Sequence, residues 1–415
     1  MMDGKPYPLP KEWMVSSIGN VIVKAKQRDP RKSPDVEFHY VDVSAVSNTS
    51  FKIIAAVPTL GSEAPSRARK VIETDDVLFA TVRPTLKRIA LVPPELDGAI
   101  ASTGYCVLRC DKAKAHPRFL YSFLITDHFN ARMAGLERGA SYPAVRDTDV
   151  KASWFPLPPL PEQKKIAHIL STVQRAIEAQ ERIIQTTTEL KKALMHKLFT
   201  EGLRNEPQKQ TEIGLVPESW EVVPVGEICR SIVPGRNKPK VFHGDIPWLT
   251  TPNIKGLDYI NADVDGLRVS SDELKSSGGR LIPEKGVIMS CVGEFGVSAV
   301  TNIEIVINQQ LHAFVCPENL NPLFLCNQLR YRKPYMQSIA ATTTIPYLNK
   351  SKCESVPIAL PGRKEQDKIA EAFETLDSKR NQHISHRQAL QDLFRTLLHE
   401  LMTAKTRVHG VALEM

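Results

Sequence analysis

The stretch "PLPPLPEQKKIAHIL" at residues 156–170 decides the fold, because a degraded copy, "ALPGRKEQDKIAEAF", returns at 359–373. In each copy at least one proline precedes a Glu-Gln pair and an apolar pattern. Proline breaks a helix interior but suits its first turn, where a glutamate also meets the positive end of the helix dipole. After the first copy no proline or glycine appears until Gly202. The sequence therefore predicts a helix from Glu162 to Thr200, roughly 58 Å long at about 1.5 Å per residue, and a second one 203 residues later.

Both predicted helices carry residues that recur in alternating steps of four and three, which is the spacing of a coiled-coil seam. A helix that packs only on its own domain is the alternative; we favour a partner helix, and the other copy is the nearest candidate. Polar seam positions such as Gln180 and His383 are expected to fix the register at some cost in stability. The apolar seam positions are Ile166, Leu170, Val173, Ile177, Ile184, Leu194 and Leu198 in the first helix and Ile369, Phe373, Leu376, Leu390, Phe394, Leu397 and Leu401 in the second.

The duplication extends over the whole chain. "LPKEW" (9–13) returns as "VPESW" (216–220), "VLFATV" (77–82) as "VIMSCV" (287–292), and "HPRF" (116–119) as "NPLF" (321–324). Short β-rich runs punctuated by glycine, proline and aspartate precede each long helix, so we predict α+β domains. The predicted division is a domain at 1–156, a long helix at 157–203, a second domain at 204–359, and a second long helix with a tail at 360–415.

Positive charge gathers in loops of both copies. Lysine and arginine number 54 against 46 aspartates and glutamates, a modest excess that is compatible with a polyanionic partner. Such loops are often only solvated, but their occurrence in both copies favours contact with phosphates. Nearby Asn, Gln and Thr side chains suit base edges, or equally turns and helix caps. The candidate DNA-binding residues are Lys24, Lys26, Arg28, Arg31, Arg67, Arg69, Lys70, Arg83, Lys87, Arg88, Arg236, Asn237, Lys238, Lys240, Asn308, Gln309, Gln310 and Thr343.

Catalytic signatures are missing from the sequence. It contains no GxxxxGK[ST] loop, no GxGxxG, no nucleophile elbow and no HExxH. "NPLF" is one residue from a motif of amino-methyltransferases, but its repeat partner "HPRF" favours helix capping by Asn321 and His116, with Pro322 and Pro117 in the first turn. The seven cysteines form no CxxC pair, so we expect reduced, buried thiols and no metal site. No apolar run suggests a signal peptide or membrane span, and we expect a cytoplasmic protein.

Taken together, the two "PEQ…IA"-type helix starts, the tryptophans at 13 and 220, "DDVLFATVRP" (75–84) and "ASTGYCVLR" (101–109) resemble the specificity subunit of Type I restriction–modification enzymes. The resemblance covers nearly the whole chain. It departs from the family pattern where Arg363-Lys364 replaces a leucine-proline pair.

The resemblance implies a non-catalytic DNA-binding subunit with two target recognition domains, each reading one half of a split, asymmetric sequence. It also implies that the two long helices pair antiparallel as a spacer with two-fold pseudo-symmetry. Its partners would be double-stranded DNA, two methyltransferase subunits that use S-adenosylmethionine, and two motor-nuclease subunits that use ATP and Mg²⁺; this chain itself would hold no cofactor. The alternatives are a coiled-coil scaffold without DNA specificity and a self-contained DNA methyltransferase.

Overall fold

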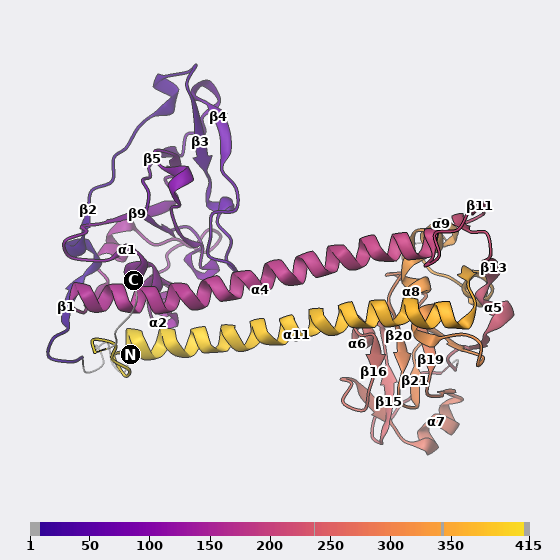
Figure 1. The fold of residues 1–415 in the computed structure, drawn as a ribbon. Helices are drawn as coiled ribbons and strands as arrows, with labels where there is room; N and C mark the ends of the chain where they lie inside the picture. Colours follow the sequence, from indigo (N-terminus) through magenta and orange to yellow (C-terminus); the bar gives the residue numbers. More distant parts are fainter. Residues whose placement is uncertain (1–8, 236, 342–343, 411–415) are drawn as a thin grey trace. The chain divides into compact units, whose positions relative to one another are not determined.

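The computed structural model describes residues 9–235, 237–341 and 344–410, and the chain divides into two compact units (Figure 1). The first unit contains Met1–Gln180 with His386–Met415, and the second contains Glu181–Ser385. Each unit therefore holds one mixed domain together with about half of each long helix. The predicted boundaries at 156/157, 203/204 and 359/360 remain predictions, because the compact units cut across both helices.

The two long helices are α4, Leu160–Glu201, and α11, Arg363–Met402. α4 contains the whole segment predicted to be helical, and α11 contains the second predicted segment except its last residue, Thr403. In the first unit, Glu162 at the start of α4 bonds to Arg407, which follows the end of α11. In the second unit, Glu365 at the start of α11 pairs with Arg204, which follows the end of α4. The two helices therefore run antiparallel within each unit.

In the part of the first unit that the structure describes there are ten strands and three shorter α-helices, and eight of the strands form two four-stranded sheets with the orders β2-β9-β6-β7 and β4-β3-β8-β5. β1 pairs with β10 and brings the chain to the start of α4. The strands are β1 Met14–Ser17, β2 Ile22–Val23, β3 Glu37–Val41, β4 Val57–Leu60, β5 Ala68–Val71, β6 Val77–Ala80, β7 Ile89–Leu91, β8 Ile100–Ser102, β9 Tyr105–Cys110 and β10 Trp154–Leu157. The helices are α1 Pro117–Ile125, α2 Asp127–Gly135 and α3 Asp147–Lys151.

The second unit repeats this plan with a five-stranded sheet, β14-β22-β19-β20-β16, and a four-stranded sheet, β17-β15-β21-β18. The strands are β11 Gln208–Thr211, β12 Gly214–Pro217, β13 Glu221–Pro224, β14 Arg230–Ile232, β15 Ile246–Leu249, β16 Tyr259–Ile260, β17 Leu267–Val269, β18 Leu281–Ile282, β19 Gly286–Ser290, β20 Ser298–Thr301, β21 Ile305–Ile307, β22 Leu311–Val315 and β23 Pro357–Leu360. The helices are α5 Val225–Ile228, α6 Thr251–Ile254, α7 Ser271–Ser277, α8 Pro322–Tyr331, α9 Lys333–Ile339 and α10 Lys350–Glu354.

Equivalent strands pair in the same way in both domains, which confirms the internal repeat. The β3·β8 and β15·β21 pairs are both parallel, whereas β6·β9 and β19·β22 are both antiparallel. The β1·β10 ladder corresponds to the β13·β23 ladder. The prediction of α+β domains with two long packed helices is therefore confirmed.

The predicted helix caps are half right. The Asn321 side chain accepts hydrogen bonds from the amides of Leu323 and Phe324 at the start of α8, as a cap does. His116 makes no such side-chain bond at the start of α1. Its imidazole therefore does not cap the helix, and only Pro117 in the first turn matches the prediction there.

Each core is completed by the end of the other copy's long helix. In the first unit, Leu401 and Met402 from the end of α11 pack with Ile166 and Leu170 from the start of α4 and with Trp13 of the domain. In the second unit, Leu198 and Phe199 from the end of α4 pack likewise with the start of α11. All fourteen apolar seam positions are buried or half-buried. The helix ends thus pack on the domain cores and on the partner helix at once.

Candidate nucleic-acid interface

The glutamine of each Glu-Gln pair ties its long helix to the domain that carries the candidate DNA-binding loops. Gln163 and Gln366 are fully buried. Each accepts a backbone hydrogen bond from the residue that precedes the domain's main helix and donates to two backbone carbonyls. The partners are His116 N, Lys114 O and Pro158 O for Gln163, and Asn321 N, Asn319 O and Pro361 O for Gln366, all at 2.8–3.2 Å. The side chain satisfies three backbone groups that would otherwise be buried and unpaired.

The glutamate of the first pair joins three segments of the first unit. The Glu162 carboxylate accepts a hydrogen bond from Trp13 Nε1 at 3.1 Å and two from the Arg407 guanidinium at 2.8 and 3.1 Å. Its side chain is only 3% exposed. Burial by itself would raise the pKa of Glu162, but the hydrogen bonds from Arg407 and Trp13 outweigh it and hold the pKa below its usual value.

The second glutamate has a related but different environment. Glu365 accepts the amide of Leu203 at 2.9 Å and lies 3.5 Å from Arg204 Nε. Trp220 corresponds to Trp13, but its Nε1 has no hydrogen-bond partner among the residues that the structure describes. In both units a glutamate at the start of one long helix contacts an arginine that follows the end of the other. The glutamate's further hydrogen-bond partner differs: it is the Trp13 side chain in the first unit and the Leu203 amide in the second.

Two basic loops of the first domain lie against each other. The chain at 26–28 forms backbone hydrogen bonds with the chain at 69–71, and Gln27 makes a β-bridge with Lys70. This brings Lys26 and Arg28 beside Arg69 and Lys70. Among the candidate cations in and next to these two loops, the exposed residues are Lys24, Lys26, Arg28, Arg31 and Arg67.

Several candidates in the first domain are already bonded within the protein. Lys70 Nζ donates to Tyr105 O and pairs with Asp147, and Arg88 donates to the carbonyls of Val43, Ser44 and Val46. The Arg31 guanidinium is held by Asp29, and Arg69 donates to Ala68 O and also lies near Asp29. Arg88 therefore has a structural role, and any phosphate contact from Lys70 or Arg69 would compete with bonds within the protein.

The turn between β6 and β7 presents two more cations. It contains a short 3₁₀ segment, Pro84–Leu86, flanked by Arg83 and Lys87. Lys87 Nζ lies 2.8 Å from Asp127 at the start of α2. The Arg83 guanidinium lies over the ring of Tyr142, 5.0 Å from its centroid. Tyr142 is 72% exposed.

In the second domain the polar triplet lies beside the basic loop. Gln309 Nε2 donates to Gly235 O at 2.8 Å, and Asn308 and Gln310 bond to each other. Asn237, Lys238, Lys240, Gln309 and Gln310 are exposed, and Asn308 is half-buried. The Lys238 ammonium lies 5.6 Å from the rings of both Phe242 and Trp248. Arg236 and Thr343 lie outside the residues that the structure describes.

Sequence reasoning missed three residues that the structure singles out. Tyr142 was missed because one exposed tyrosine in a loop carries no periodic signal. Arg204 and Arg407 were missed because each follows a long helix, where a basic residue reads as ordinary favourable charge at a helix end. The repeat does carry a signal for the arginines, since they are 203 residues apart, like the two glutamates that they contact.

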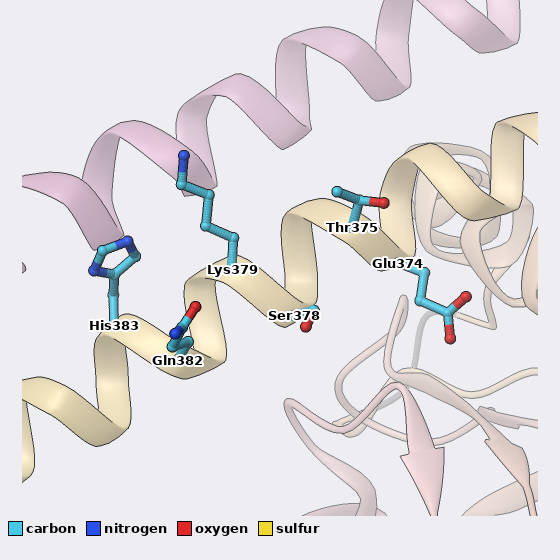
Figure 2. Close-up of a pocket in the computed structure, with 6 residues that line it drawn as sticks. All are labelled: Glu374, Thr375, Ser378, Lys379, Gln382 and His383. Carbon is cyan, nitrogen blue, oxygen red and sulfur yellow. The ribbon is translucent and has the colours of Figure 1, made fainter.

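The described residues offer little for small-molecule chemistry. They include no group of three or more His, Cys, Asp or Glu side chains placed to hold a metal ion. Figure 2 shows a shallow depression whose six lining residues, Glu374, Thr375, Ser378, Lys379, Gln382 and His383, all come from α11. Ligand sites are usually enclosed and lined from several elements, so this depression does not suggest a cofactor site. Within those same residues, no helix combines the length and the apolar character needed to cross a membrane.

The chain thus combines two domains of the same strand pairing, basic loops that differ between them, and two antiparallel helices. A known protein family has a matching sequence profile. The profile of the Type I restriction modification DNA specificity domain matches residues 10–188 and 217–389. The chain belongs to this family. It is accordingly a non-catalytic specificity subunit of a Type I restriction–modification system, and the resemblance seen in the sequence is confirmed.

Full-length relatives agree with this assignment. The chain is 24% identical to a putative type I restriction enzyme MjaX specificity subunit of Methanocaldococcus jannaschii, over 96% of this chain and 95% of the relative. It is 21% identical to the type I restriction enzyme HindI specificity subunit of Haemophilus influenzae, over 88% and 94%.

Solved structures support the fold. A chain from a structure concerned with complex assembly and conformational transition of the type I R-M system is 30% identical, with a TM-score of 0.58 over 96% of this specificity subunit and 99% of that chain. The S subunit of a Type-I restriction-modification system from M. genitalium is 16% identical, with a TM-score of 0.60 over 95% and 98%, and it supports the fold alone.

Proposed function

We propose that this specificity subunit reads a split, asymmetric sequence in double-stranded DNA, with one half-site for each recognition domain. The domains are those predicted at 1–156 and 204–359. The observation that carries the proposal is that the two domains share their strand pairing while their equivalent loops carry different polar and charged side chains. Two domains with the same strand framework but different loop side chains suit two half-sites of different sequence.

The exposed cations support contact with the DNA backbone. Lys24, Lys26, Arg28 and Arg67 lie on adjoining loops of one domain, and Lys238 and Lys240 lie on the other. Phosphate contacts of this kind supply salt-dependent affinity and orientation, whereas base edges supply specificity. The polar turn at Asn308–Gln310 is the base-reading candidate of the second domain.

We further propose that the paired helices set the gap between the half-sites, and that the subunit positions two methyltransferase and two motor-nuclease subunits. A structurally similar chain comes from work on complex assembly of a type I R-M system. The internal repeat offers two equivalent docking surfaces to two identical partners. S-adenosylmethionine, ATP and Mg²⁺ would then be bound by those partners.

Sequencing the methylated bases of the host genome tests the proposal, with the gene intact and deleted and the methyltransferase subunit expressed in both strains. Deletion should abolish adenine methylation at one split motif, which also reveals both half-sites and their gap. An unchanged methylation pattern would overturn the proposal and return the coiled-coil scaffold without DNA specificity to the front.

A further inference from the structure

Both recognition domains pair the turn after β6 or β19 with the loop before α3 or α10, and we call this pair of loops the tip. In the first domain Val82 makes a β-bridge with Ala144, and Arg83 N donates to Pro143 O at 2.7 Å. In the second domain Val292 bridges Tyr347, and Gly293 N donates to Pro346 O at 2.8 Å. Arg83 and Gly293 therefore occupy the same backbone position.

This position requires a left-handed backbone. φ is +49° at Arg83 and +76° at Gly293. Glycine adopts this conformation readily, whereas an L-residue with a β-carbon is sterically disfavoured there. The second domain uses glycine, and the first retains an arginine. A residue held in a disfavoured conformation that its own repeat avoids suggests that the side chain has a function.

A second position in the same turn serves as an internal comparison. The strand pairing aligns Lys87 with Gly296. The equivalent residues Val77 and Val287 pair with Leu91 and Val300, and Lys87 and Gly296 each lie four residues before that pairing partner. Lys87 also has a left-handed backbone, with φ +51°. Its ammonium, however, pairs with Asp127, so its side chain has a partner within the protein.

Arg83 differs from Lys87 because its charge has no such partner. Its guanidinium makes no hydrogen bond or ion pair to the residues that the structure describes, and it lies over the exposed ring of Tyr142. Stacking restrains the plane of a guanidinium while its N–H edge stays available. A guanidinium held in this way can donate two hydrogen bonds to the O6 and N7 acceptors of guanine, which is the commonest specific arginine contact in the major groove. A phosphate contact would need no such restraint.

We propose that Arg83, positioned by Tyr142, reads a guanine in the half-site of the first recognition domain. At the equivalent position the second domain has a glycine, which offers no side chain for such a contact. Its tip carries Gly293, and a β-carbon there would lie 3.8 Å from the side chain of Ile345. This inference rests on the proposed function and adds the residue, the base and the half-site.

The test uses the full chain expressed with its methyltransferase subunit and sequencing of methylated sites. Arg83→Gly removes the side chain and installs the residue that the second domain uses at this backbone position. We expect one G·C position in one half-site to become degenerate, with the other half-site and the gap unchanged. Tyr142→Phe should leave the motif unchanged, and Tyr142→Ala should relax the same position partly.

Lys87→Gly is the matched control, because it makes the same change at the other left-handed cation of the turn. It should leave the motif intact. If it relaxes the same position, the conformation of the turn and not Arg83 reads the base, and the inference is wrong. The inference also fails if Arg83→Gly lowers methylation uniformly at an unchanged motif, alters both half-sites, or if the affected half-site has no G·C pair. If the wild-type complex methylates no split motif, the proposed function itself fails, which is a separate outcome.

Binding by the purified complex gives a second readout. The wild type should prefer its own duplex over one with A·T at the assigned position by about 10- to 100-fold, in line with one bidentate contact. Arg83→Gly should retain less than about threefold preference, with its Tm unchanged or raised. A lost preference that also appears with Lys87→Gly would contradict the assignment.

Discussion

A buried charge network in the second unit gives the most demanding stability prediction. Lys191 of α4 bonds to Asp377 of α11 and lies 3.9 Å from Asp258 of the domain. Asp258 also pairs with Arg330, and Asp377 lies 3.4 Å from Arg380. The side chains of Asp377 and Lys191 are 5% and 11% exposed. Three cations thus surround two carboxylates with little water.

Asp377→Asn changes this balance to three cations around one carboxylate. Removing one partner of a buried ion pair costs about 3–5 kcal/mol, and here the buried charge of Lys191 is left with Asp258, which it shares with Arg330, as its remaining carboxylate. With a denaturant slope of about 2.5 kcal/mol per M urea, the midpoint of the second unit should fall by about 1–2 M. Lys191→Met leaves two cations and two carboxylates and should cost less, about 1.5–3 kcal/mol.

The repeat supplies the control, because the equivalent positions in the first unit are occupied by Phe394, Gln174 and Ile177. A triple variant, Lys191→Phe, Asp377→Gln and Arg380→Ile, keeps the Asp258–Arg330 pair and should recover most of the stability lost in Asp377→Asn. Urea unfolding followed by pulsed hydrogen exchange and mass spectrometry reports the peptides of each unit separately. The reasoning is refuted if Asp377→Asn stays within about 1 kcal/mol of the wild type, or if the loss appears in the first unit.

Three further predictions concern the first unit. Because the folded pKa of Glu162 is depressed, its ionised form stabilises the fold above the unfolded pKa of about 4.3, and this contribution disappears as pH falls through the folded value. The difference in unfolding free energy between wild type and Glu162→Gln should therefore be largest near pH 7 and shrink below about pH 4, and a difference independent of pH would contradict this. Gln163→Leu leaves three buried backbone groups unpaired and should cost about 2–4 kcal/mol, with faster hydrogen exchange at the His116 amide; unchanged exchange would show that water replaces the side chain. Arg83→Gly should stabilise the first unit by up to about 1–2 kcal/mol in thermal unfolding, because it relieves a left-handed residue, and a loss of stability would mean that the side chain holds the turn together.

The sequence predicts the long helices and the repeat well because their signals are local. Prolines before Glu162, the absence of helix breakers up to Gly202 and the four-three spacing act within one segment. The sequence could not predict the network, because Lys191 and Asp377 are 186 residues apart and only the antiparallel pairing of the helices brings them together.

The candidate interface was only partly predictable for a different reason. A charged residue in a loop looks the same in sequence whether it faces water or bonds inward. Arg88 lies in a basic run, yet its guanidinium is held by three carbonyls, whereas the guanidinium of Arg83 in the same run lies over a tyrosine ring and makes no ion pair or hydrogen bond within the described part of the chain. The tertiary fold separates the two, because it places the carbonyls of residues 43–46 beside Arg88 and the ring of Tyr142 beside Arg83, and neither composition nor spacing encodes this.

If the proposed function holds, the division between a shared frame and a variable tip would let one fold serve two different half-sites. The frame, meaning the sheets and the start of the long helix, depends on side chains that are the same in both copies. Gln163 and Gln366, for example, make three equivalent hydrogen bonds to the backbone. The tips depend on main-chain bonds, from Arg83 N to Pro143 O and from Gly293 N to Pro346 O, which form whatever side chain is present. A change of tip residue therefore alters what is presented to a base without disturbing the bonds that hold the tip. On the proposed function, new recognition would arise by substitution at the tip, whereas a substitution at either glutamine would act on the stability of the whole unit.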